Sequence, residues 1–299
     1  MEKYQKKFID LTTGERYAYI DQGRGDKVIL LLHGNMSSSL YYYDFLARMK
    51  EEEGYRLIAP DLRGFGDSSY HNRFSSFDDL ADDLVSFLDK LEIKKVLLVG
   101  WSAGAGVGLR LIVKKPGLVE KFVHLNGASY RGYPIFKKDA TFKPVLGSVY
   151  TSKDELALDP VQVLPMISAF AGKQKAFVDY VYGLTIFNVK KPDQADLDLL
   201  FEETLKQRNL VDFDWSLASL NMSGSTNLYH SGTNDIHLVD IPVLLLWGAK
   251  DLVVLEYMVR ETHNALASSE LLIYPNASHA LLLDEPERFK ADVLNFFNQ

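Results

Sequence analysis

The stretch that decides the fold is Val96-Leu97-Leu98-Val99-Gly100-Trp101-Ser102-Ala103-Gly104, which runs into the helix-like segment Ala105–Val113. Its first four residues are all apolar, as a strand buried in a parallel sheet requires, because helices cover both faces of such a sheet. Glycines then flank Ser102, which suits a sharp turn where strained backbone angles crowd neighbouring side chains. The stretch therefore predicts a buried strand, a tight turn carrying a serine, and a helix.

Similar apolar runs of strand length recur along the chain, each followed by a loop. They are Val28–Leu32, Tyr55–Ala59, Phe122–Leu125, Val243–Trp247 and Leu271–Tyr274. Lys7–Ile9 and Arg16–Ile20 flank a turn-like segment and predict a hairpin. Between the runs, Ser76–Leu91 has apolar residues at helical spacing and a capping box at its start. This alternation predicts an α/β fold with a doubly wound, mostly parallel sheet.

The alternation stops near Tyr130. From there to about Val239 we find aromatic-rich helical segments, such as Lys173–Phe187 and Asp193–Gln207, without clear strands. The strand pattern then resumes, and a helix over Pro286–Phe297 ends the chain. We therefore expect a core made of residues 1–129 and 240–299, with a helical cap inserted at 130–239.

Composition excludes several classes of protein. Hydrophobic residues make up 47% of the 299 and charged residues 24%, which is ordinary for a soluble globular protein. The chain contains no cysteine, so it has no cysteine nucleophile or thiolate metal site. The net charge of −7 argues against a nucleic-acid partner. No stretch approaches the roughly 20 apolar residues of a membrane span, and residues 1–11 lack a signal peptide, so we expect a cytoplasmic protein.

Ser102 is a candidate nucleophile, and it needs a base because a free hydroxyl attacks poorly. A serine on a strand–turn–helix is raised above the sheet at a helix N-terminus, where backbone N–H groups favour developing negative charge. His279 lies in a loop directly after the strand Leu271–Tyr274, where the chain order serine, acid, histidine would place the base. His124 lies in an apolar run and is expected in the core. The remaining histidines are His33, which we expect to stabilise its own loop, and His71, His230, His237 and His263 on the surface.

Asp251 is the candidate acid, since it follows the strand Val243–Leu246. Its task would be to hold the imidazole in the correct tautomer and to stabilise the imidazolium. Asp240 precedes that strand and would lie at its wrong end, whereas Asp284 follows His279 and is expected to cap the last helix.

An oxyanion hole needs two backbone N–H groups aimed at the tetrahedral intermediate. One is expected from Ala103, directly after the serine, and the other from the loop that follows Val28–Leu32. In that loop we favour Asn35, with Met36 as the alternative. Met36 and Trp101 are also expected to contact the substrate.

With these residues in hand, the chain resembles the α/β-hydrolase superfamily over nearly its whole length outside the cap. The motifs that carry the resemblance are His33-Gly34-Asn35, the loop Asp61-Leu62-Arg63-Gly64-Phe65-Gly66-Asp67-Ser68, Gly100–Gly104, Gly248-Ala249-Lys250-Asp251 and Ser278-His279. The resemblance implies an eight-stranded sheet with a helical cap, no metal and no organic cofactor. It also implies that Arg63 ties loops together near the site.

Within the superfamily the chain is similar to small-molecule esterases, so the expected activity is hydrolysis of a small carboxylic ester with an apolar acyl group. Haloalkane dehalogenases and epoxide hydrolases use an aspartate nucleophile where this chain has Ser102. Carbon–carbon bond hydrolases and cofactor-free haloperoxidases or perhydrolases share the triad and remain alternatives. The first of these would need a basic cap residue such as Lys190, Lys191 or Arg208 in the pocket. A ligand sensor that has kept the fold without turnover is a further alternative.

Overall fold

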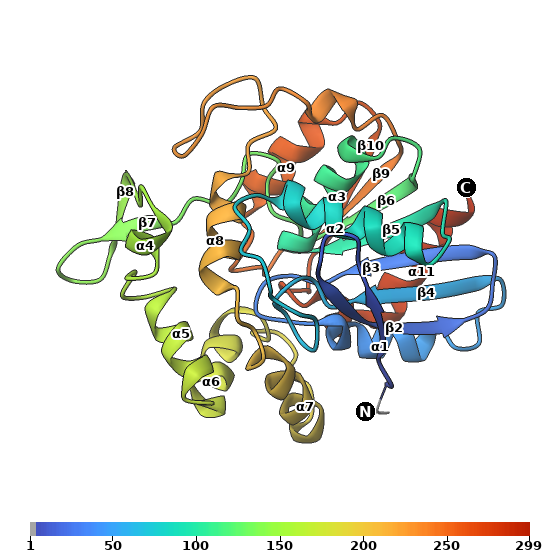
Figure 1. Ribbon diagram of the computed structural model, residues 1–299, viewed down its shortest axis with the longest axis horizontal. Coiled ribbons are helices and arrows are strands. Elements are labelled where there is room, and N and C mark those ends of the chain that lie inside the picture. The colour runs from blue at the N-terminus through green and yellow to red at the C-terminus, as the bar shows by residue number, and fades with distance from the viewer. Residues whose placement is uncertain (1–3) are drawn as a thin grey trace.

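An eight-stranded sheet forms the centre of the molecule (Figure 1). The computed structural model describes residues 4–299. The strands follow the order β1-β2-β4-β3-β5-β6-β9-β10, in which β2 pairs antiparallel with β1 and with β4 and all other pairs are parallel. Their bounds are β1 Lys7–Asp10, β2 Arg16–Gly23, β3 Lys27–Leu32, β4 Tyr55–Pro60, β5 Val96–Trp101, β6 Val119–Leu125, β9 Val243–Gly248 and β10 Ser269–Tyr274. The mostly parallel α/β sheet and the hairpin at its edge confirm the predicted fold class.

Helices cover both faces of this sheet, which is why its central strands are apolar throughout. Ile29 and Leu31 of β3 belong to one buried cluster, and Leu30 and Leu32 belong to the other. Helices α2 and α3 pack in the second cluster, and α1 and α11 pack in the first. The bounds outside the cap are η1 Ser39–Tyr42, α1 Tyr43–Arg48, α2 Phe77–Lys90, α3 Ala103–Lys114, α9 Glu256–Ala265, α10 Leu281–Asp284 and α11 Pro286–Asn298. This packing fixes the carboxyl ends of β3, β5, β6, β9 and β10 along one edge, where the candidate residues lie.

The segment between β6 and β9 contains the cap helices, and in Figure 1 α8 lies between α4 and the main sheet. Its helices are α4 Lys153–Leu156, α5 Leu164–Ala171, α6 Lys175–Thr185, α7 Gln194–Thr204, α8 Leu210–Ser219 and η2 Ile236–Leu238. The cap also contains two strands that the sequence did not reveal, because β7 (Phe136–Lys138) and β8 (Pro144–Val149) form a two-stranded antiparallel sheet. This hairpin is separate from the main sheet and projects from it (Figure 1).

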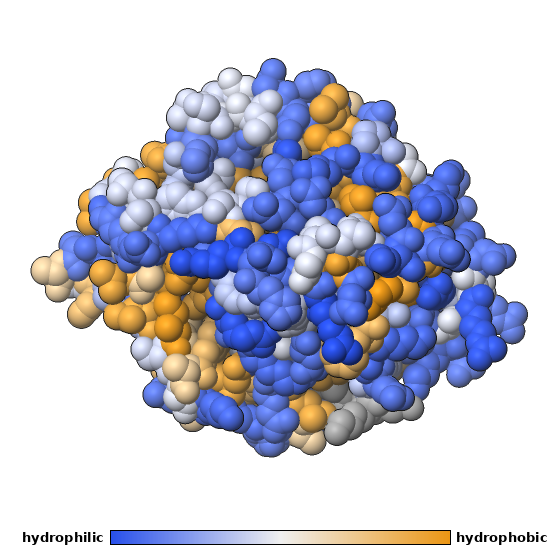
Figure 2. Space-filling view, in the orientation of Figure 1, coloured by the Kyte–Doolittle hydropathy of each residue, from blue (hydrophilic) through white to orange (hydrophobic). Residues whose placement is uncertain are grey.

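The cap also carries exposed apolar side chains. Figure 2 shows apolar surface on the side of the molecule where β7, β8 and α5 lie in Figure 1. The exposed residues of this region are Phe142, Val145, Leu146, Leu158, Val161 and Leu164. Within residues 4–299, no helix has the length and apolar character needed to cross a bilayer.

Candidate active site

Ser102 occupies the turn between β5 and α3 with a positive φ of 55° and ψ of −124°. Such a conformation is rare for a residue with a side chain and is held by the surrounding structure. The N–H of Ser102 donates to the carbonyl of Leu125 at 2.9 Å, and its carbonyl accepts from Ala105 and Ala128. The strained turn thus places the hydroxyl at the N-terminus of α3, as the sequence predicts.

Two glycines allow the loop after β3 to lie directly against this turn. A Cβ on Gly104 would come within 2.4 Å of the carbonyl oxygen of His33, and a Cβ on Gly34 within 2.9 Å of the Cβ of Ser102. Neither contact is possible for a residue with a side chain unless the backbone or the serine moves. The glycines are therefore needed to bring residues 34–36 next to Ser102.

His279 and Asp251 form a buried pair beside the turn. His279 Nδ1 lies 2.8 Å from Asp251 Oδ2, and both side chains are almost fully buried. Asp251 Oδ1 accepts from the N–H groups of Val253 at 2.7 Å and Val254 at 2.9 Å. These donors stabilise the carboxylate in its loop after β9. Because Nδ1 of His279 is engaged by Asp251, Nε2 is the ring nitrogen available to a reacting group.

Ser102 and His279 line the same cavity, which has a volume of about 140 Å³. Asn35 and Met36 line it as well, so the structure brings these four predicted residues together. Among residues 4–299, no hydrogen bond joins the Ser102 hydroxyl to His279. Catalytic hydrogen bonds are often long before substrate binds and tighten in the complex, so this geometry is compatible with a nucleophile and its base.

Hydrogen bonding distinguishes Asn35 from Met36, the two candidates for the second N–H donor of the oxyanion hole. The N–H of Met36 donates to the side-chain oxygen of Asn35 at 2.9 Å and is therefore engaged. The N–H groups of Asn35 and Ala103 have no acceptor within residues 4–299. Two free donors thus flank the serine, one from each of the expected loops.

Cap residues hold the loop that contains Asn35. The side-chain amide of Asn35 donates to Asp214 at 2.7 Å, and its oxygen accepts from Gln207 at 2.9 Å. The carbonyl of Met36 accepts from the hydroxyls of Tyr182 and Thr204. The position of this loop consequently depends on the cap as well as on β3.

Trp101, which was expected to contact the substrate, does not line the cavity. Only 3% of its surface is exposed, its indole N–H donates to the carbonyl of His279 at 2.9 Å, and it is not among the residues that line the cavity. The expected contact between Trp101 and substrate is therefore not supported, because the buried ring packs against the ring of His279 instead, with 5.6 Å between the ring centroids. Its visible contact fixes the backbone of His279.

His33 and Arg63, both expected to stabilise loops, lie in the loops after β3 and β4, and His124 lies in β6. His33 Nε2 accepts from the N–H of Leu62 at 3.0 Å, and burial lowers the pKa of His33 to about 4. The neutral ring of His33 therefore links the loops after β3 and β4 through this hydrogen bond. Arg63 makes two hydrogen bonds of 2.7 Å to Asp83 of α2 and so anchors the same loop to a helix. His124 is fully buried and its pKa is likewise lowered to about 4 by burial, in line with a core position.

Sequence reasoning missed three polar residues of this region. Asn126 donates to Asp251 Oδ2 and to the carbonyl of Ser278, each at 2.8 Å. Its position directly after β6, at the carboxyl edge of the sheet, was the signal that could have found it. Gln207 and Asp214 come from the cap, and the sequence carries no comparable signal for them because their positions depend on cap packing.

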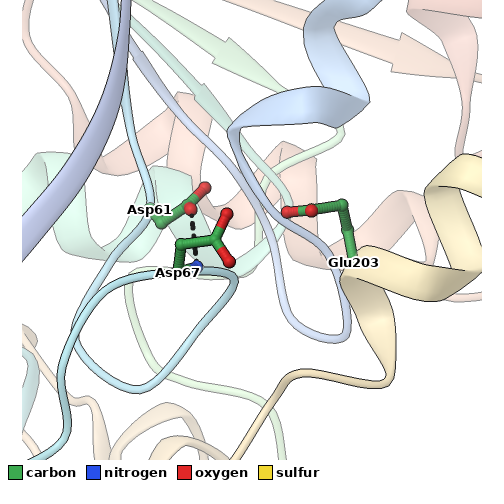
Figure 3. A group of neighbouring side chains, drawn as sticks. All are labelled: Asp61, Asp67 and Glu203. Carbon is green, nitrogen blue, oxygen red and sulfur yellow. Dashed lines mark hydrogen bonds between the residues drawn. The ribbon is translucent and has the colours of Figure 1, made fainter. Parts of the chain in front are cut away.

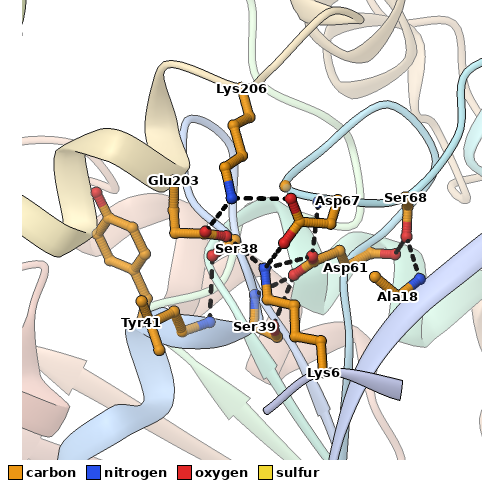
Figure 4. A network of polar contacts seen from close by, with 12 residues as sticks. Lys6, Ala18, Ser38, Ser39, Tyr41, Asp61, Asp67, Ser68, Glu203 and Lys206 are labelled. Carbon is orange, nitrogen blue, oxygen red and sulfur yellow. Dashed lines mark hydrogen bonds and ion pairs between the residues drawn. The ribbon is translucent and has the colours of Figure 1, made fainter. Parts of the chain in front are cut away.

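Three carboxylates, Asp61, Asp67 and Glu203, lie close enough together to suggest a cation site (Figure 3). The cation is already present, because the Lys6 ammonium lies 2.7 Å from Asp61, 3.0 Å from Asp67 and 2.5 Å from Glu203 (Figure 4). Lys206 adds a second ammonium beside Asp67 and Glu203. The cluster is an ion-pair network that joins the segment before β1 to the cap helix α7.

The fold and this arrangement of residues define an α/β-hydrolase. A sequence model of the alpha/beta hydrolase family matches residues 29–292, and the chain belongs to this family. It is 24% identical over 288 residues to the AB hydrolase superfamily protein YisY of Bacillus subtilis (strain 168), covering 93% of this chain and 94% of that protein.

A second relative in sequence and a solved structure are also similar to this chain. The chain is 26% identical over 305 residues to a 2-hydroxy-6-oxononadienedioate/2-hydroxy-6-oxononatrienedioate hydrolase of a Pseudomonas species, covering 99% of this chain and 97% of that protein. An esterase from Exiguobacterium antarcticum has the same fold, with a TM-score of 0.75, 20% identity, and coverage of 99% and 100% of the two chains.

Proposed function

We propose that this protein is a serine hydrolase that cleaves a small carboxylic ester, with Ser102 as nucleophile, His279 as base and Asp251 as the residue that orients the base. The observation that carries the proposal is the cavity lined by both Ser102 and His279, with His279 held at 2.8 Å by Asp251. A strained serine and a free imidazole nitrogen in one cavity, with the unpaired N–H groups of Asn35 and Ala103 near the serine, are the components that acyl transfer requires.

In the proposed first step, Ser102 Oγ attacks the carbonyl carbon while His279 Nε2 takes the hydroxyl proton. The carbonyl oxygen becomes an oxyanion beside the N–H groups of Asn35 and Ala103, and the engaged N–H of Met36 supports this choice. His279 then gives the proton to the leaving alcohol, which leaves an acyl group on Ser102. In the second step water loses a proton to His279, attacks the acyl carbon and releases the acid.

The lining of the cavity supports a small, largely apolar acyl group. Ala128, Ile135, Ile186, Leu210, Leu217, Val253 and Val254 contribute apolar side chains. A volume of about 140 Å³ suits a short chain.

The alternative of a carbon–carbon bond hydrolase has less support. It needs a basic residue to bind the acidic tail of its substrate, and no lysine or arginine within residues 4–299 lines the cavity. Lys191 pairs with Asp179, and Arg208 donates to backbone carbonyls of the loop after β4.

The test is hydrolysis of p-nitrophenyl esters of graded acyl length by the native chain and by Ser102→Ala. Ser168→Ala, which removes an exposed hydroxyl from α5, is the matched control. We expect Ser102→Ala to abolish turnover and to prevent labelling by a fluorophosphonate, while Ser168→Ala changes neither. Turnover and labelling that survive in Ser102→Ala would refute the assignment. A native chain that neither turns over nor becomes labelled would instead favour a ligand-binding role.

A further inference from the structure

The buried carboxyl groups of the cap are paired with cations in every case except one. Asp212 lies beside Arg73 at 2.6 Å and Lys153 at 2.9 Å. Asp159 lies 2.8 Å from Lys138, and Glu203 contacts two lysines. Asp214, two residues after Asp212 on α8, contacts no lysine or arginine within residues 4–299. An unpaired buried carboxyl is unfavourable, so its persistence calls for an explanation.

Asp214 faces the cavity that contains Ser102 and His279. Its Oδ1 accepts from the amide of Asn35 at 2.7 Å, whereas its Oδ2 has no partner among residues 4–299. Burial raises the pKa of Asp214 to about 7, and the charge of Asp159 adds to this effect. One carboxyl oxygen of this lining residue is therefore left without a partner in the described chain, in a space that is otherwise largely apolar.

The charges around this oxygen favour a cationic ligand group. No lysine or arginine of the described chain lines the cavity, and Asp214 is its one acidic lining residue there. An anionic substrate group would meet a carboxylate with no compensating cation. An ammonium group would form a desolvated, charge-assisted hydrogen bond with Oδ2, which is roughly twice as strong as a hydrogen bond between neutral groups.

We propose that Asp214 is the specificity-determining residue of the cavity and binds a protonated amino group of the substrate. This inference rests on the proposed function and names its substrate class: small esters that carry an ammonium group a few bonds from the scissile carbonyl. The volume of about 140 Å³ restricts the ligand to a short amine. The hydrogen bond to Asn35 holds the carboxyl beside the loop that supplies the proposed oxyanion donor.

The test is direct binding of n-butylammonium and n-butanol, measured by calorimetry at pH 8 on Ser102→Ala protein. These probes match in length and differ in charge, and the Ser102→Ala background makes the measurement independent of turnover. Asp214→Asn is introduced into the same protein, because asparagine keeps an oxygen acceptor for Asn35 and loses the charge. Asp240→Asn, at an exposed carboxyl, is the control for net charge.

We expect n-butylammonium to bind at least about tenfold more tightly than n-butanol, and Asp214→Asn to remove that preference. Asp240→Asn should leave it unchanged. Equal binding of the two probes, or a preference that survives Asp214→Asn, would overturn the proposal. Failure of ester hydrolysis by the native chain would count against the proposed function alone, since the binding preference does not depend on it.

Discussion

The side-chain nitrogen of Asn126 lies 2.8 Å from Oδ2 of Asp251, the same oxygen that contacts His279 Nδ1. Asn126 also donates to the carbonyl of Ser278, the residue before the proposed base. One amide therefore fixes both the acid and the loop of the histidine. We interpret Asn126 as a positioning residue, because it holds Asp251 and the loop of His279 but is not itself among the residues that line the cavity.

Replacing Asn126 by glycine should lower kcat by about tenfold to hundredfold, as expected for the loss of a hydrogen bond to a charged group. Glycine suits the positive φ of 41° at this position, so the backbone can stay in place. KM should change little, because the side chain does not reach the substrate. Steady-state kinetics on a p-nitrophenyl ester provide the measurement. Asn227→Ala, which removes a cap amide bound to two backbone carbonyls, should leave kcat unchanged, and an equal loss in both variants would contradict the positioning role.

Lys6→Met should destabilise the fold by about 3 kcal/mol, because it leaves the buried carboxylate of Asp61 without its cation, while Glu203 keeps only Lys206. Burial opposes the charge on Lys6, but these carboxylates outweigh it and raise its pKa above the ordinary value. Burial raises the pKa of Asp67, but hydrogen bonds from Lys206 and Lys6 outweigh it and hold that pKa below its ordinary value. The loss should therefore shrink at low pH, where Asp67 takes up its proton. Urea unfolding at two pH values measures it, with Lys7→Met as the control, since Lys7 is more than half exposed. A difference below about 0.5 kcal/mol would mean that water compensates the cluster.

The same ion pairs predict that chelators leave the wild-type melting temperature unchanged. The Lys6 ammonium occupies the position between the three carboxylates that a divalent cation would need. Thermal unfolding with excess EDTA and with added Ca²⁺ should give the same midpoint. A reproducible shift of several degrees in opposite directions would show that the carboxylates hold a metal after all.

The sequence predicts those parts of the molecule whose structure is set locally. The strand, turn and helix around Ser102 lie in one continuous stretch, and the carboxyl ends of parallel strands must meet at one edge, which places His279 and Asp251 near the serine. The hairpin β7–β8 was missed because β7 has only three residues and β8 is largely exposed, so no buried face imposes a regular apolar pattern.

The place of Asp214 in the lining of the cavity could not be predicted for a different reason. Asp214 lies between Phe213 and Trp215 in a segment whose apolar residues reveal only a helix. Whether this carboxyl faces solvent, an arginine or the cavity depends on how α8 rotates against the core. Asp212 and Asp214 are two residues apart and have opposite environments, with and without a cation. Such a difference follows from three-dimensional packing and not from residue type.

The raised pKa of Asp214 predicts how an uncharged replacement changes stability with pH. The folded state holds the proton with a pKa of about 7, well above the roughly 3.9 of an unfolded aspartate. Folding is therefore progressively penalised as pH rises from about 4 to 7, and the penalty is complete above that range. Asp214→Asn lacks this penalty, so its free energy of unfolding relative to wild type should increase by up to about 4 kcal/mol between pH 4 and 8. Urea titrations across this range measure the difference, and Asp240→Asn should give a flat line. A difference for Asp214→Asn that is equally flat would show that the carboxyl is charged at low pH or well solvated.

Leu210 lines both the proposed catalytic cavity and an open groove of about 520 Å³ beside the cap, and we infer that it is the barrier between them. Leu210→Ala should join the two spaces and allow a long acyl chain to pass from the serine into the groove. We expect the ratio of kcat/KM for p-nitrophenyl octanoate to that for the acetate to rise at least about tenfold, since each buried methylene contributes about 0.8 kcal/mol. The same change should destabilise the fold by about 2–4 kcal/mol, because Leu210 is buried.

Leu217→Ala is the matched control, since Leu217 lines the cavity but not the groove. It should enlarge the cavity without opening it and therefore favour chains of intermediate length. If both variants showed the same limiting chain length, Leu210 would not be the barrier between the two spaces.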